Sequence, residues 1–176
     1  MSALRYRRVL IKLSGESLAG EGAGGWNPAL LRQFAGELAT LQRAGAQVGL
    51  VVGGGNLCRG SELALAGVER PTADGIGMLA TLMNALAMQD ALGKQGVAAH
   101  VLSALPVATL CEPFNRQRAL ALLAQGEIVL CAAGTGNPLF TTDTAASLRA
   151  IELGAELLIK ATKVEGIYTS DPRKDP

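Results

Sequence analysis

Short aliphatic runs alternate along this chain with segments of helical periodicity, and that alternation limits the folds open to it. The runs, each of a length typical of a buried strand, are residues 8–13, 48–52, 97–102, 127–132 and 155–160. The helical segments between them are residues 28–44, 77–92, 115–124 and 143–153, with Asn27 and Asp143 as predicted N-caps. This rhythm predicts parallel β-α-β units, and therefore an α/β protein whose sheet is covered by helices on both faces.

The composition favours one domain and argues against several classes of protein. The 176 residues, 49% of them hydrophobic, suit a single core. A net charge of +1 and 3% aromatic residues do not favour a nucleic-acid-binding surface. No run approaches the roughly 20 apolar residues of a membrane span, and the basic start is not typical of a signal peptide. The three cysteines are irregularly spaced, so we expect free thiols in a cytoplasmic protein.

A glycine-rich stretch, Gly53-Gly-Gly-Asn-Leu-Cys-Arg-Gly60, follows the run at residues 48–52 directly. Glycine lets backbone N–H groups approach an anion closely, and the guanidinium of Arg59 can meet phosphate oxygens with two donors. The simpler interpretation is a tight strand-to-helix turn with an incidental surface arginine. The position at the C-terminal end of a predicted parallel strand favours anion binding.

The four loops expected at the C-terminal ends of strands carry lysines, an arginine, glycines, hydroxyls and aspartates. They contain no histidine, and the single His100 lies inside a predicted strand, where a structural role is favoured. This inventory fits phosphoryl transfer, which depends mainly on positioning and charge neutralisation. Lys12 could stabilise the transferring group or simply point into solvent, and Asp143 could orient lysines or magnesium as well as cap a helix. No G-x-x-x-x-G-K-[ST] motif is present, so the chain is not a P-loop kinase.

Five stretches of the chain resemble a known family. They are Lys12-Leu-Ser-Gly-Glu16, the run 53–60, Asp74-Gly-Ile-Gly-Met-Leu-Ala-Thr-Leu-Met-Asn84, Gly134-Thr-Gly-Asn-Pro-Leu-Phe-Thr-Thr-Asp143 and Lys160-Ala-Thr-Lys-Val-Glu-Gly-Ile-Tyr-Thr-Ser-Asp-Pro172. In this order the chain resembles the bacterial uridylate kinase (UMP kinase) family of the amino-acid-kinase superfamily. The resemblance implies an αβα sandwich with a mainly parallel sheet. It also implies transfer of the ATP γ-phosphoryl group to UMP, giving UDP and ADP.

The same resemblance implies further properties and a set of site residues. It implies Mg²⁺ bound with ATP, a homohexamer, allosteric control and a role in pyrimidine nucleotide synthesis; metal ligands are not assigned. The composition described above predicts neither nucleic acid nor a membrane as a partner. The implied catalytic residues are Lys12, Arg59 and Asp143. The implied UMP-binding residues are Gly54, Arg59, Asp74, Thr135, Gly136, Asn137, Pro138, Leu139, Phe140, Thr141 and Thr142. The implied ATP-binding residues are Lys12, Leu13, Ser14, Gly15, Gly55, Arg59, Thr162, Lys163, Tyr168 and Asp171.

The family continues beyond the position of Pro176. We therefore expect residues 1–176 to form one amino-acid-kinase-like domain in which the C-terminal part of the ATP-binding half is missing. Two alternatives remain open on the residues. The first is a sister kinase that phosphorylates a carboxylate, although Arg59 and the loop at 134–143 favour a nucleoside monophosphate as the acceptor. The second is a non-catalytic fragment that only binds nucleotide.

Overall fold

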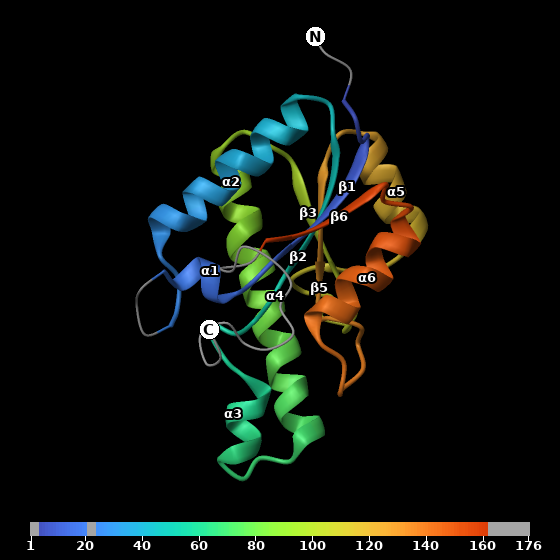
Figure 1. Cartoon of the computed structure of the whole chain (residues 1–176). Helices are drawn as coiled ribbons and strands as arrows, with labels where there is room; N and C mark the ends of the chain where they lie inside the picture. Colours follow the sequence, from blue (N-terminus) through green and yellow to red (C-terminus); the bar gives the residue numbers. More distant parts are fainter. Residues whose placement is uncertain (1–3, 21–23, 162–176) are drawn as a thin grey trace, which may run out of the picture.

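The computed structural model describes residues 4–20 and 24–161, and in this part of the chain it contains one six-stranded, wholly parallel sheet. The strands follow the order β4-β3-β5-β2-β1-β6 across the sheet (Figure 1). Their bounds are β1 Arg8–Leu13, β2 Gln47–Val52, β3 Ala99–Ser103, β4 Glu112–Pro113, β5 Ile128–Ala132 and β6 Leu157–Ala161.

Helices cover both faces of the sheet, which confirms the predicted αβα sandwich (Figure 1). Helices α2 and α4 pack on one face, and α5 and α6 pack on the other. The helix bounds are α1 Glu16–Ala19, α2 Pro28–Arg43, α3 Gly60–Leu65, α4 Arg70–Lys94, α5 Arg116–Ala124 and α6 Thr142–Leu153. None of the helices in the described part of the chain is long and apolar enough to cross a bilayer.

Alternate residues of each strand fill two separate cores. On β2, Val48, Leu50 and Val52 pack toward α2 and α4, whereas Val51 packs toward α5 and α6. The alternation follows from the two-residue period of a strand, and burial on both faces explains why the strands are continuous aliphatic runs. Burial also raises the pKa of the Cys131 thiol to about 12, so this free cysteine stays protonated.

Local signals explain where two of the helices begin. The side chain of Asn27 accepts hydrogen bonds from the N–H groups of Ala29 and Leu30, and Pro28 occupies the first turn of α2. Asn115 caps α5 in the same way through the N–H of Arg118. The structure confirms the predicted cap at Asn27, whereas the cap at Asn115 was not predicted.

Helix α4 begins seven residues before the predicted start at Gly77, at Arg70. Pro71 suits the first turn of a helix, and the helix continues through Gly75 and Gly77. The predicted cap at Asp143 is also wrong, because Thr141 caps α6 by accepting the N–H of Thr144. Three short elements, α1, α3 and β4, were not predicted, since two to six residues carry too little periodicity.

We expect Leu130→Ala to lower the free energy of unfolding by about 2–5 kcal/mol, because the side chain is fully buried in the core beside α2 and α4. Chemical denaturation measures the change. Leu65→Ala is the matched control, since this leucine is 90% exposed and should shift stability by less than about 0.5 kcal/mol. Equal losses in the two variants would contradict the assignment of the core.

Candidate active site

The turns that follow β1 and β2 lie too close together for side chains, and the turn after β2 also lies against α4. A Cβ added to Gly15 would lie 2.5 Å from the carbonyl oxygen of Gly53. A Cβ added to Gly54 would lie 2.9 Å from the carbonyl oxygen of Gly77 on α4. Both distances are shorter than real Cβ contacts, so glycine is required at Gly15 and Gly54.

The turn after β2 contains backbone N–H groups that have no hydrogen-bond acceptor in the described part of the chain. The N–H of Gly53 donates to the carbonyl of Leu13, and the carbonyl of Gly54 accepts the N–H groups of Leu57 and Cys58. No acceptor within residues 4–20 and 24–161 takes the N–H of Gly54 or of Gly55. Consecutive free N–H groups in a turn form a concave site that binds anions.

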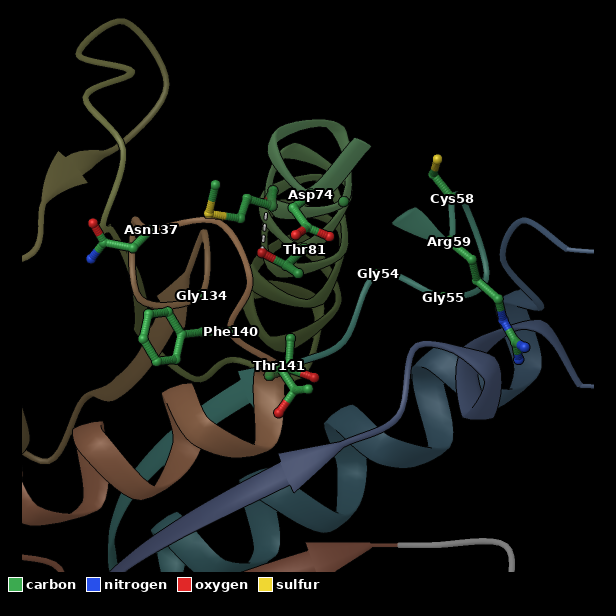
Figure 2. A pocket seen from close by; sticks show the side chains of 13 residues that line it. Gly54, Gly55, Cys58, Arg59, Asp74, Thr81, Gly134, Asn137, Phe140 and Thr141 are labelled. Carbon is green, nitrogen blue, oxygen red and sulfur yellow. Dashed lines mark hydrogen bonds between the residues drawn. The ribbon is translucent and has the colours of Figure 1, made fainter. Parts of the chain in front are cut away.

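A cavity of about 330 Å³ opens beside this turn, large enough for a small ligand (Figure 2). Figure 2 shows Asp74 and Thr81 on α4 between two groups of residues: Asn137 and Phe140 lie on one side, and the glycine turn lies on the other. The full lining is Gly54, Gly55, Cys58, Arg59, Asp74, Gly77, Met78, Thr81, Gly134, Asn137, Phe140, Thr141 and Thr142.

Asp74 connects α4 to the loop after β5. Its carboxylate accepts the N–H of Leu139 at 2.9 Å and the guanidinium N–H of Arg70 at 3.0 Å. The hydrogen bond from Leu139 is the main reason why the pKa of Asp74 is below its usual value, and Arg70 contributes in the same direction. A carboxylate accepts about four hydrogen bonds, so Asp74 can still accept from a ligand hydroxyl.

Thr81 fixes the start of the same loop. Its hydroxyl accepts the N–H of Ala133 at 2.8 Å and donates to the carbonyl of Met78 at 2.7 Å. Ala133 has a φ of 61°, a conformation that costs energy for a residue with a Cβ. The bond from Thr81 helps to hold this backbone directly after β5.

Arg59 lines the cavity, but its guanidinium is directed away from Asp74 (Figure 2). It forms ion pairs with Glu16 and, at 3.7 Å, with Glu62. The side chain is 45% exposed, so exchange of these carboxylates for a ligand phosphate needs no opening of the core.

A second cluster lies on the α5 and α6 face of the sheet, where Lys12, Lys160 and Asp143 meet. Lys12 follows Leu10 by two residues and therefore shares its face, and the parallel register pairs Lys12 with Lys160. The lysine Nζ atoms lie 2.9 Å (Lys12) and 2.8 Å (Lys160) from the Asp143 carboxylate. These three side chains help to line a small cavity of about 130 Å³.

Two opposing effects act on Asp143. Partial burial, the larger single cause, raises its pKa, but the hydrogen bonds and charges of Lys160 and Lys12 together leave the pKa below its usual value. Asp143 also lies in the first turn of α6, where the helix dipole favours a negative charge. The carboxylate therefore stays ionised near neutral pH.

The two cavities are adjacent, because consecutive residues of α6 line them. Thr142 lines the larger cavity and Asp143 lines the smaller one. The hydroxyl of Thr142 also lies near the glycine turn, 3.6 Å from where a Cβ on Gly53 would be. The N-terminus of α6 therefore contributes to both cavities.

The structure brings together most of the residues implied for the two sites. Seven UMP-site candidates line the larger cavity: Gly54, Arg59, Asp74, Asn137, Phe140, Thr141 and Thr142. Thr135, Gly136, Pro138 and Leu139 belong to the same loop but do not line it. Gly55, an ATP-site candidate, lines this cavity rather than the smaller one.

The remaining ATP-site candidates divide into two groups. Lys12 lies at the lysine cluster, Ser14 and Gly15 lie in the turn after β1, and the side chain of Leu13 is buried in the core, so that only its backbone could meet a ligand. The second group, Thr162, Lys163, Tyr168 and Asp171, lies outside the described residues. His100 lies on β3 beside Glu127, away from both cavities.

Sequence reasoning missed five residues that line the larger cavity: Cys58, Gly77, Met78, Thr81 and Gly134. Met78 and Thr81 follow Asp74 by four and seven residues, a spacing that places all three on one face of a helix. That signal was available, but the predicted helix began at Gly77 and so excluded Asp74.

The described residues contain no group of three or more side chains suited to hold a metal ion alone. Mg²⁺ is usually held by one or two carboxylates together with substrate phosphates. Asp143 offers such a carboxylate. Its buried Oδ1 atom forms an ion pair with Lys12 but accepts no hydrogen bond from the described residues. The donor set therefore fits a magnesium ion that arrives with a nucleotide.

Comparisons with known proteins give one consistent result. The sequence pattern of the amino acid kinase family matches residues 7–176. A uridylate kinase of Xanthomonas axonopodis pv. citri is 56% identical over 174 residues, which cover 99% of this chain and 72% of the relative. A uridylate kinase of Dichelobacter nodosus is 57% identical over 170 residues, covering 97% and 70%.

Solved structures agree with the sequence comparisons. The crystal structure of UMP kinase from Bacillus anthracis matches with a TM-score of 0.91 at 37% identity, covering 97% of this chain and 70% of that one. UMP kinase from Ureaplasma parvum matches with a TM-score of 0.89 at 32% identity, covering 97% and 72%. The chain therefore belongs to the amino acid kinase family, and it is similar to uridylate kinases of that family.

Proposed function

We propose that this protein is a UMP kinase, which transfers the γ-phosphoryl group of ATP to the phosphate of UMP and forms UDP and ADP. The observation that carries the proposal is that consecutive residues at the start of α6, Thr142 and Asp143, line the two cavities. One cavity offers anion-binding backbone and the other offers two lysines, as a donor and an acceptor phosphate would require. The uridylate kinase relatives support UMP as the acceptor.

The larger cavity is the proposed UMP site. The free N–H groups of Gly54 and Gly55 would hold the acceptor phosphate, and Arg59 would add its guanidinium after leaving Glu16. Asp74 would accept a hydrogen bond from a ribose hydroxyl. The loop from Thr135 to Thr142 would enclose the uracil ring, with Phe140 as an apolar surface.

The lysine cluster is the proposed site of the ATP phosphates. Lys12 and Lys160 would neutralise the charge that spreads over the transferring phosphoryl group. Asp143 would hold both ammonium groups in place and would be the residue that meets a magnesium ion brought by ATP, where the ion adds positive charge at the phosphates. Ser14 and Gly15, in the turn that follows β1, would contact the ATP phosphates through their backbone. We also propose Thr162, Lys163, Tyr168 and Asp171 as ATP contacts.

Two alternative functions have less support. A sister kinase acting on a carboxylate would not need the free N–H groups of the glycine turn together with Arg59 on the acceptor side. A non-catalytic nucleotide-binding protein would not need two lysines that pair with the same aspartate in the smaller cavity. The identity of 56–57% to uridylate kinases also favours the kinase.

We also propose assembly into a homohexamer, allosteric control and a role in pyrimidine nucleotide synthesis, as the family resemblance implies. Exposed apolar side chains on α4, among them Ile76, Leu79 and Met83, support self-association. We propose a cytoplasmic location because the proposed substrates, ATP and UMP, are cytoplasmic nucleotides.

The test of the function is a panel of acceptors incubated with the protein, ATP and Mg²⁺, with products separated by chromatography. We expect UDP and ADP in equal amounts from UMP, and little phosphorylation of CMP, AMP, aspartate or N-acetylglutamate. Lys12→Ala should lower the turnover at least about 100-fold, because its charge acts on the transition state, while calorimetry should find UMP affinity nearly unchanged. Phosphorylation of a carboxylate instead of UMP would support the sister kinase, and UMP binding without turnover would support the non-catalytic alternative.

We expect Asp74→Ala to reduce the preference of the protein for UMP over dUMP by about tenfold or more, because a site built to bond a hydroxyl rejects the analogue that lacks it. Calorimetric titration with each nucleotide measures the ratio. Asp90→Ala is the matched control, since Asp90 also forms an i,i+4 ion pair on α4 but is far more exposed. A ratio in Asp74→Ala equal to that of the wild type would remove Asp74 from the ribose site.

The lowered pKa of Asp143 predicts a loss of stability in acid. A carboxyl whose pKa is lower when folded stabilises the protein above its unfolded pKa of about 3.9, and this contribution disappears as the pH falls through the folded value. The melting temperature of Asp143→Asn should therefore be lower than that of the wild type at pH 7, and this difference in melting temperature should become smaller as the pH falls below about 4. Thermal melting from pH 7 to pH 3 measures the difference. A difference that stays constant across this range would show that the lysines do not depend on the charge of Asp143.

A further inference from the structure

Asn84 is a fully buried polar residue on α4. Its amide nitrogen donates to the carbonyl of Gly53 at 2.6 Å and to the side chain of Asn56 at 2.7 Å. Its amide oxygen accepts from the indole N–H of Trp26 at 2.8 Å and from Asn56 at 3.2 Å. All four hydrogen-bonding positions of the amide are therefore used.

The bond to Gly53 determines where the next N–H group points. The carbonyl of Gly53 and the N–H of Gly54 belong to one planar peptide unit and point in opposite directions. Because Asn84 draws the carbonyl toward α4, the N–H of Gly54 is directed away from Asn84. That N–H lacks an acceptor within residues 4–20 and 24–161, and Gly54 lines the larger cavity.

Asn56 extends the same network to a third segment. Its side chain donates to the carbonyl of Gly25 at 2.7 Å, and its own carbonyl accepts the N–H of Gly25 at 2.9 Å. Trp26, the next residue, reaches Asn84 through its indole. The glycine turn is thus tied both to α4 and to the segment that precedes α2.

We propose that Asn84 is a positioning residue that orients the Gly53–Gly54 peptide for the acceptor phosphate. This inference rests on the proposed function, because it takes the phosphate of UMP as the group that Gly54 receives. Asn84 itself is buried behind the turn and touches no ligand. Its effect should fall on the phosphate alone and should leave recognition of the uridine part unchanged.

Calorimetric titration with UMP and with uridine separates these two parts of the ligand. We expect Asn84→Ala to reduce the ratio of UMP affinity to uridine affinity about tenfold, because the unbonded peptide can rotate away from the phosphate. Uridine affinity itself should change less than about twofold. Should Asn84→Ala fail to show a cooperative thermal transition, Asn84→Ser provides the same test, since serine is too short to reach Gly53 and Asn56 together.

Asn115→Ala is the matched control for a loss of stability without a change at the site. Asn115 caps α5, so its removal should destabilise the fold, yet the UMP-to-uridine ratio should equal that of the wild type. A fall of both affinities by the same factor in the Asn84 variant would reduce Asn84 to a structural residue and overturn the inference. Failure of the wild-type protein to bind UMP would overturn the proposed function and this inference with it.

The single tryptophan of the chain gives an independent measurement. Loss of the amide oxygen of Asn84 leaves the indole N–H of Trp26 without its protein partner, so the fluorescence maximum should shift to longer wavelength in Asn84→Ala. The Asn115→Ala spectrum should match that of the wild type. An unchanged spectrum in Asn84→Ala would show that the network from Trp26 to the glycine turn does not form in solution.

Discussion

The larger cavity depends on helix α4, whose polar side chains bond to the backbone of both loops that enclose it. Asn84 bonds to the turn after β2, whereas Thr81 and Asp74 bond to the loop after β5. An α-helix has a fixed rise of about 1.5 Å per residue, so the spacing of these three side chains also sets the spacing of the loops. The loops can therefore consist largely of glycine, threonine and asparagine and still hold a defined shape.

The lysine cluster illustrates how sheet register creates a charged site. Parallel pairing of β1 with β6 places Lys12 and Lys160 side by side on one face, where two positive charges repel each other. Asp143 offsets this repulsion, but one carboxylate cannot neutralise two ammonium groups. The cluster keeps an excess positive charge at a helix N-terminus, a combination that favours anions.

Much of the fold could be predicted from the sequence because its strands are buried on both faces. A strand such as β2 or β5 is then a continuous aliphatic run. The glycine turn at residues 53–55 also marks the end of β2. The expected helix began at Gly77, and the earlier start of α4 at Arg70 was missed because most of the stability of a helix comes from packing that only the tertiary structure supplies.

Single side chains were harder to place than elements. Aspartate is a common helix-capping residue, and Asp143 was expected to cap α6. Its carboxylate instead binds Lys12 and Lys160, which lie 131 and 17 residues away along the chain, and Thr141 caps the helix. Arg59 was correctly expected beside the glycine turn, yet its ion pair with Glu16 depends on the path of the chain after β1. Such long-range pairings leave no pattern along the chain.

The strand order has a consequence for how this protein is made. Strands β2 and β3 do not pair with each other; each pairs with β5, which lies between them. Until residues 128–132 leave the ribosome, the earlier strands can form only two separate pieces of sheet, each with an open edge. Open parallel edges invite pairing with other chains, and parallel sheets close slowly because their contacts are distant in sequence. Synthesis of β5 is therefore the step at which the nascent chain can first join its two halves and bury both edges.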